Sequence, residues 1–280
     1  MQQSRRFCFQ IHIFRTQTNP AIEKGFKGLS LHVGINKYDR EYYGGNIDLN
    51  QCVFDAERLH DFAVDRDYQA NLMTNSNATV AKFKAFILNA AKTLKKGDFF
   101  FLTNSSHGTY DDNIVNGQTK RMTAICLHDG IFWDYEFREL LKKFKTGVTV
   151  IWLSDCCFAE SNWRFMRGED QRPYNGARAR FIRAPQAVKE AKVTATQGDK
   201  RQIKCKMFTY SSSNIYQVSY EDDRGGVFTT SVLDALAKEP GLSYYQLWRR
   251  TSEIIAPLYP QSPVFENVRA SHLTGNLFLA

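Results

Sequence analysis

The chain has 280 residues, 43% of them hydrophobic and 14% aromatic, which is enough for a sizeable core and excludes a disordered chain. No apolar run approaches the roughly 18–20 residues that a membrane-spanning helix needs, so we expect no membrane span. The formal net charge of +8 is carried by residues 164–206, where twelve Lys and Arg face four Asp and Glu, and twelve minus four is eight.

The N-terminal stretch, residues 1–24, is basic at its start but lacks the uninterrupted apolar core of a secretory signal. We expect it to be a poorly ordered extension of one domain that spans residues 25–280. The cysteines show no paired spacing typical of a zinc site, and we expect free thiols in the reducing cytoplasm. They are Cys8, Cys52, Cys126, Cys156, Cys157 and Cys205.

Four short apolar runs, rich in β-branched and aromatic residues, predict buried strands. They are residues 29–35, 98–103, 148–153 and 207–211. Apolar residues at helical spacing predict helices around them. These helices cover residues 49–63, 80–94, 135–145, 227–238 and 244–256, the second with Asn77 or Thr79 as N-cap. The alternation predicts an α/β fold with a mainly parallel central sheet and helices on both faces.

Two of the predicted strands end in residues that could carry chemistry. The strand at 98–103 leads to His107 and Gly108, and the strand at 148–153 leads to Cys157. Ligands bind at the carboxyl ends of strands in open α/β sheets, so neighbouring strands would bring the histidine and the cysteine together. An imidazole beside a thiol is the minimum apparatus of thiolate catalysis. The N–H groups of Gly108 and Cys157 could then form an oxyanion hole.

A buried thiol and a structural loop histidine are the alternative interpretation of that pair, and the surrounding blocks of sequence favour catalysis. The chain contains, in order, KGLSLHVGINKYD, LNQCVFDAERL, FFFLTNSSHG, VTVIWLSDCC and GGVFTTSVLDAL. These blocks resemble those of bacterial caspase-like peptidases, the group that includes the metacaspases, over roughly residues 25–275. His107 also precedes Cys157 by 157 − 107 = 50 residues, the separation typical of caspases.

The resemblance implies a caspase-like fold and a cysteine endopeptidase with a Cys157–His107 dyad. Its D-x-C motif places Asp155 two residues before the nucleophile, so Cys156 becomes a buried neighbour. Metacaspases cut after Arg or Lys, and the resemblance implies an acidic S1 pocket, which holds the P1 side chain before the cut bond. Its implied residues are Cys52, Asp55, Ser105 and Asp155, with an exposed helix acid as the alternative for Asp55.

The basic segment, residues 164–206, is too long for an ordinary loop and lacks periodicity. In the family this stretch is a linker that is often cut by the enzyme itself, and a linker rich in Arg and Lys suits such cleavage. The alternative is a patch that binds nucleic acid or an anionic surface without sequence preference. We expect peptide or protein substrates with a basic P1 residue, and no specific nucleic acid partner.

The sequence departs from the family at two places. Phe158, Ala159 and Glu160 replace the usual H-S-G, which puts the catalytic rate in doubt. No cofactor is required for the chemistry. Many metacaspases need calcium, but the acids of this chain at the positions of the family's calcium ligands do not make the usual full set. The candidate ligands, for which solvated loop acids are the alternative, are Asp111, Asp112, Asp129 and Asp134.

Two other functions compete with that of a peptidase. The first is a catalytically weak or inactive caspase-like module for signalling or interaction, against which the His107 and Cys157 pair argues. The second is a nucleotide-binding or phosphotransfer domain, which would need a glycine loop that cradles phosphates. Neither GxGxxG nor GxxxxGK[ST] occurs in the chain.

Overall fold

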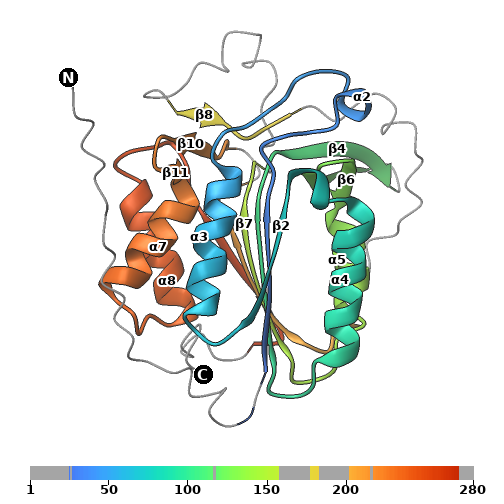
Figure 1. Ribbon diagram of the computed structural model, residues 1–280, viewed down its shortest axis with the longest axis vertical. Coiled ribbons are helices and arrows are strands. Elements are labelled where there is room, and N and C mark those ends of the chain that lie inside the picture. Colours follow the sequence, from blue (N-terminus) through green and yellow to red (C-terminus); the bar gives the residue numbers. More distant parts are fainter. Residues whose placement is uncertain are drawn as a thin grey trace, which may run out of the picture.

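The computed structural model describes residues 25, 27–115, 118–157, 177–182, 202–214 and 217–270. The extension predicted at 1–24, the departure at 158–160 and most of the basic segment lie outside these residues. The described chain forms a central sheet with helices on both faces (Figure 1). This is the predicted α/β architecture.

The central sheet has six strands in the order β12-β9-β7-β3-β1-β2. Five run parallel, and β12 pairs antiparallel with β9 at one edge. The central strands β1, β3 and β7 are buried along their whole length, as expected of parallel strands covered on both faces. The six strands are β1 (Gly28–Gly34), β2 (Gln69–Thr74), β3 (Phe99–Ser105), β7 (Thr149–Asp155), β9 (Lys206–Ser211) and β12 (Val264–Val268).

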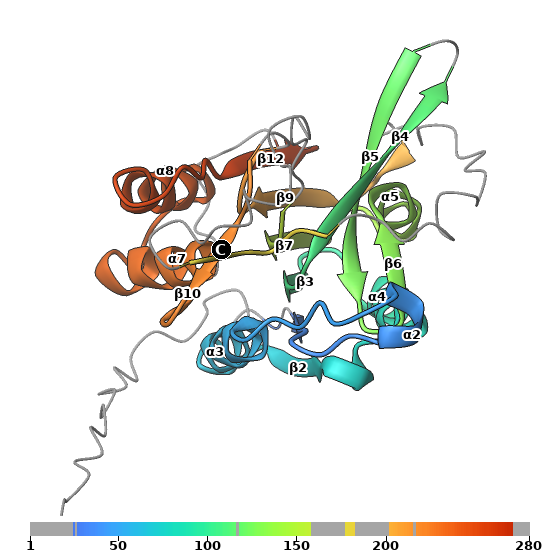
Figure 2. The same ribbon diagram turned by 90° about the horizontal axis from the view of Figure 1, so that it is seen from above.

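Two small antiparallel sheets flank this core. One, of order β4-β5-β6, follows β3 in the chain; its β4–β5 hairpin projects from the domain (Figure 2), whereas β6 is buried. The other, of order β11-β10-β8, lies above the ends of the central strands (Figure 1). Their strands are β4 (Gly108–Val115), β5 (Gln118–Leu127), β6 (Gly130–Trp133), β8 (Arg178–Ala179), β10 (Tyr220–Asp222) and β11 (Gly225–Gly226).

The longer helices cover the two faces of the sheet and form two apolar cores. Helices α4 and α5 pack on one face, and α3, α7 and α8 pack on the other (Figure 1). Burial of each large apolar side chain contributes about 1.5–3 kcal/mol. The helices are α2 (Arg40–Tyr43), α3 (Cys52–Val64), α4 (Val80–Thr93), α5 (Asp134–Leu141), α7 (Val227–Lys238) and α8 (Tyr244–Ile255), with the short 3₁₀ helix η1 (Asn75–Asn77).

Most predicted elements match these bounds within one to three residues. Thr79 caps α4, because its side chain accepts the N–H of Lys82. The helix predicted at 135–145 is too long, since α5 ends at Leu141. Phe144 continues the apolar period, but it is buried through a turn in which its N–H donates to the carbonyl of Leu141.

Candidate active site

The two strands that were expected to carry the catalytic residues are neighbours in the sheet. β3 and β7 pair in parallel with Ser105 opposite Asp155, the last residue of each strand. His107 and Cys157 each follow two residues later, so they leave the sheet at the same edge. This confirms the expected proximity of the two strand ends.

His107 is held by two hydrogen bonds, one through its backbone N–H and one through its ring. Its N–H donates to the hydroxyl oxygen of Tyr38 at 2.8 Å, and its Nε2 lies 2.7 Å from the carbonyl oxygen of Ile47. A carbonyl only accepts, so Nε2 carries a proton and the neutral ring has its lone pair on Nδ1. Nδ1 is buried without a hydrogen-bond partner among the described residues. The ring is therefore oriented with a basic nitrogen available.

Burial sets the protonation state of both candidate catalytic groups. It lowers the pKa of His107 from 6.5 to about 4, opposed by the backbone of Ile47 and Arg180. Burial also raises the pKa of the Cys157 thiol well above its usual 9, opposed by the backbone N–H of Ser219, which lies 2.9 Å from Sγ. At neutral pH this arrangement therefore holds a neutral imidazole and a neutral thiol.

A short piece of the basic segment, residues 177–182, occupies the site. β8 pairs antiparallel with β10, and the N–H of Arg180 donates to the carbonyl of Ser219 at 2.9 Å. The carbonyl oxygen of Arg180 accepts the N–H groups of Gly108 at 2.9 Å and Cys157 at 3.4 Å. Arg180 thus has its carbonyl between the two N–H groups expected to form an oxyanion hole.

The side chain of Arg180 is fully buried in an acidic pocket. Its Nη1 lies 2.7 Å from Ser105 Oγ and 3.1 Å from Asp155 Oδ2. Its Nη2 lies 2.7 Å from Asp55 Oδ2 and 3.3 Å from Glu221 Oε2. The pocket therefore surrounds one guanidinium with three carboxylates and a hydroxyl.

The carboxylate of Asp155 is fixed by groups on two further elements. Its Oδ2 accepts the N–H and the hydroxyl of Thr229, at the start of α7, at 3.0 and 2.7 Å, and its Oδ1 accepts the hydroxyl of Ser219 at 2.8 Å. Burial raises the pKa of Asp155, and the guanidinium of Arg180 opposes that rise. The pocket is thus built to receive a cation.

Asp55 is fixed in the same manner. It accepts the backbone N–H of Gly226 at 3.0 Å, the hydroxyl of Ser105 at 2.8 Å and the Nη2 of Arg58 at 2.7 Å. Its side chain has no exposed area, so the exposed-acid interpretation is wrong. Because each oxygen already has a partner, the carboxylate holds its position with or without the guanidinium.

Two glycines leave space that a side chain would fill. A Cβ on Gly108 would lie 1.7 Å from the carbonyl oxygen of Cys157. A Cβ on Gly226 would lie 2.1 Å from Asp155 Oδ2 and 2.5 Å from Arg180 Nη1. Close backbone approach thus requires glycine at the candidate oxyanion hole and at the wall of the pocket.

The structure brings three of the four expected S1 residues into contact with the guanidinium, namely Asp55, Ser105 and Asp155. Cys52 lies beside the pocket, with its Sγ 4.0 Å from Glu221 Oε2. Cys156 is buried, and its Sγ lies 3.3 Å from Ser154 Oγ. All five cysteines in the described ranges are buried and form no disulfide.

Sequence reasoning missed four residues of the site. Tyr38 and Ile47 orient His107 through a hydroxyl and a backbone carbonyl, and Glu221 is a third acid in the pocket. Arg180 was counted only as one of twelve basic residues. The one available signal for Glu221 was its place in SYEDDRG, which directly precedes the GVFT block of the family.

The candidate calcium ligands lie on three separate parts of the chain. Asp111 and Asp112 belong to β4, Asp129 accepts the N–H of Val80 at 2.8 Å, and Asp134 pairs with Arg138 at 3.0 Å. Within the described part of the chain, no three His, Cys, Asp or Glu side chains form a group that could hold a metal. The calcium site stays a prediction from the resemblance.

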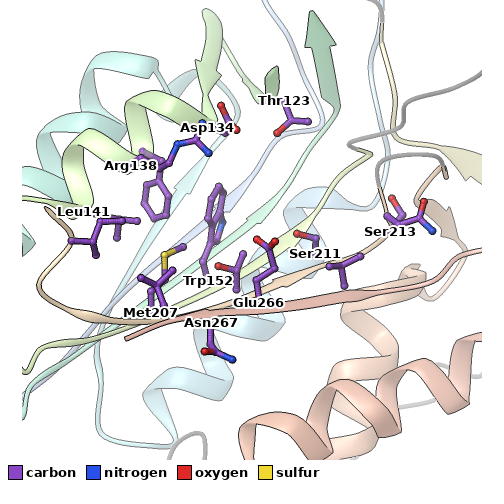
Figure 3. A pocket seen from close by; sticks show the side chains of 16 residues that line it. Thr123, Asp134, Arg138, Leu141, Trp152, Met207, Ser211, Ser213, Glu266 and Asn267 are labelled. Carbon is purple, nitrogen blue, oxygen red and sulfur yellow. Dashed lines mark ion pairs between the residues drawn. The ribbon is translucent and has the colours of Figure 1, made fainter. Parts of the chain in front are cut away.

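A separate pocket lies between α5 and the strands β7, β9 and β12, where Asp134, Arg138, Trp152 and Glu266 line it (Figure 3). Its lining includes none of the candidate catalytic or S1 residues. Among the residues that the structure describes, every helix is too short or too polar to span a bilayer.

Comparison with known proteins identifies the family and the fold. A crystal structure of a protein from Geobacter sulfurreducens is 28% identical, with a TM-score of 0.74 over 91% of this chain and 99% of that one. Caspase-1 from Spodoptera frugiperda shares 10% identity and a TM-score of 0.55 over 87% of each chain, a likeness of fold. Curated proteins give no significant match. Because the caspase-domain model matches residues 27–275, the chain belongs to the caspase-domain family of cysteine peptidases.

Proposed function

We propose that this protein is a cysteine endopeptidase that cuts after arginine or lysine, with Cys157 as nucleophile and His107 as base. One observation carries the proposal. Arg180 of the chain itself lies in the site as a substrate would, with its side chain in the acidic pocket and its carbonyl oxygen between two N–H donors. A basic P1 residue fits this pocket, and an acidic one would face three carboxylates.

We infer the following steps for these residues. Sγ of Cys157 attacks the carbonyl carbon of the P1 residue while its proton passes to Nδ1 of His107. The N–H groups of Gly108 and Cys157 hold the oxyanion. The C–N bond then breaks, and His107 returns the proton to the leaving amine. Water attacks the thioester with His107 as base, which releases the new carboxylate and restores the thiol.

We further propose that the chain processes itself at the Arg180–Phe181 bond. The backbone on the far side of that bond is also held, because the N–H of Ile182 donates to the carbonyl of Gly108 at 3.1 Å. Cleavage would give fragments of 180 and 280 − 180 = 100 residues. Until it is cut, the same segment fills the site and excludes other substrates.

Self-processing is tested with purified wild type, C157A and R180A, followed by intact-mass spectrometry. Wild type should yield the two expected masses at a first-order rate that is independent of protein concentration. C157A should stay whole, and R180A should lack a cut at this position. Identical fragments from C157A would reject self-cleavage.

Cleavage of other substrates is tested with fluorogenic peptides that carry Arg, Lys or Asp at P1, with and without calcium. The processed wild type should cut after Arg and Lys, and C157A should cut none. An arginyl chloromethyl ketone should label Cys157, whereas an inactive signalling module would remain unlabelled. Cleavage after Asp alone would overturn the proposed specificity.

A further inference from the structure

Glu221 is a third carboxylate in the pocket, beyond the residues that the resemblance implies. It lies on β10 and is buried, and its Oε2 lies 3.3 Å from Nη2 of Arg180. The next acid on the strand, Asp222, points elsewhere, since its carboxylate accepts the hydroxyl of Tyr259 at 2.9 Å. Only the first of these two neighbouring acids therefore faces the guanidinium.

The carboxylate of Glu221 is held at the start of α3. Its Oε1 accepts the N–H of Asn50 at 3.1 Å, and its Oε2 lies 3.3 Å from the N–H of Gln51. Gln51 is the N-cap of α3 and makes no side-chain capping bond, so the glutamate takes part of that role. Backbone N–H groups at a helix N-terminus favour a negative charge. The carboxylate is thus positioned before any ligand arrives.

The pocket divides its acceptors between the two terminal nitrogens of the guanidinium. Nη1 contacts Ser105 and Asp155, and Nη2 contacts Asp55 and Glu221. The inner nitrogen Nε of Arg180 has no hydrogen-bond partner among the described residues. The pocket therefore recognises the guanidinium through its two terminal nitrogens, each of which has its own pair of acceptors.

Lysine cannot reproduce this arrangement. Its single ammonium stands at the position of the central guanidinium carbon, one bond short of both Nη atoms, so it cannot contact both sides of the pocket directly. Asp55 and Asp155 are each held by other groups and cannot move to it. The contact of Glu221 with Nη2 of Arg180, at 3.3 Å, is the longest of the four, so Glu221 is the acceptor that we expect lysine to leave without a direct contact.

We propose that Glu221 makes this pocket selective for arginine over lysine at P1. The expected effect on peptide cleavage rests on the proposed function. The expected effect on stability rests on the contacts of Arg180 alone. Charge-assisted contacts of this kind change binding by about tenfold or more. Glu221 is thus a specificity-determining residue.

The first experiment needs no catalysis and uses the full chain with C157A, so that nothing is cut. R180K, E221Q and the double variant are compared by urea denaturation. R180K should raise the unfolding equilibrium constant about 100-fold when Glu221 is present and about 10-fold in the E221Q background. D222N, which removes the same charge from the next residue, should leave the effect of R180K unchanged. An R180K effect that is equal in both backgrounds would reject the proposal.

The second experiment compares kcat/KM for matched fluorogenic peptides with Arg or Lys at P1. E221Q should lower the Arg to Lys ratio about tenfold through loss on the Arg peptide, and D222N should keep the wild-type ratio. An equal loss of kcat/KM on both peptides would mean that the negative charge of Glu221 attracts either cation without discriminating between them, and it would reject the proposal. If no peptide is cut by any variant, the proposed function fails, and the denaturation cycle alone decides the role of Glu221.

Discussion

Nη2 of Arg180 lies 2.7 Å from Oδ2 of Asp55, and neither side chain reaches solvent. The two residues are 125 positions apart, so this ion pair ties the basic segment to the first long helix. Removal of one partner from a buried pair leaves an uncompensated charge, which costs far more than the loss of a surface contact. The free energy of unfolding of the chain therefore reports whether Arg180 occupies the acidic pocket.

R180A should destabilise the C157A chain by about 3–5 kcal/mol, because three buried carboxylates lose their cation. Urea denaturation measures the loss. R178A is the matched control, since Arg178 is exposed and its Nη1 contacts only the carbonyl of Asp48 in the described structure, at 3.0 Å. Its cost should stay below about 1 kcal/mol. Equal costs for the two variants would show that Arg180 is not seated in the pocket.

G226A should abolish cleavage after arginine, with a loss of about 100-fold or more, because a methyl group would stand against Asp155 and the guanidinium. Self-cleavage followed by intact mass gives the rate. G241A is the control, since a Cβ there would meet nothing within 4 Å. Normal cleavage by G226A would mean that arginine binds elsewhere.

Self-cleavage should persist to lower pH than an ordinary histidine would allow. Burial lowers the pKa of His107 to about 4, so the neutral ring that accepts the thiol proton is present above that value. The rate should be level from pH 5 to 7 and fall below about pH 4. Rapid quench measures it, with circular dichroism to show that the chain stays folded. A midpoint near 6.5 would contradict the buried, occupied site.

His32 should make folding sensitive to acid. It is buried with hydrogen bonds of 2.9 Å to both Ser30 and Thr103, and burial lowers its pKa to about 3. The unfolded chain binds a proton between pH 6.5 and 3 that the folded chain does not, so stability falls with falling pH by about 1.4 kcal/mol per unit. H32Q in the C157A chain should lower the slope of unfolding free energy against pH by that amount. An unchanged slope would show that His32 is protonated in the fold.

The sequence predicted the central sheet because its inner strands are continuous apolar runs. It missed β2 and β12, which lie at the two edges of the sheet and are nowhere buried. It also missed β5, whose first half, QTKRM, has no strand-like alternation. Strands of this kind are fixed by their partners and not by their own pattern. The same holds for β8, two residues long, which pairs only because β10 lies beside it.

The site residues that could be predicted from the sequence are those that stand in family motifs. His107, Cys157, Asp55 and Asp155 stand in blocks that carry the family pattern. Glu221 does not, because three acids follow one another in EDD, and only the fold buries the first and turns it toward Arg180. The position of Arg180 in the pocket could not be predicted from the sequence either. Composition shows that the segment is basic, but it does not show which basic residue binds in the pocket.

The pairing of Ser105 with Asp155 places the last residue pair of the β3–β7 ladder inside the acidic pocket that holds Arg180. A slip of one residue between these strands would turn every side chain of one strand to the opposite face, and with it both the apolar core and one wall of the pocket. A misregistered sheet could therefore neither bury its core nor recognise a cation. The same hydrogen-bond register therefore determines both the packing of the apolar core and the geometry of the acidic pocket.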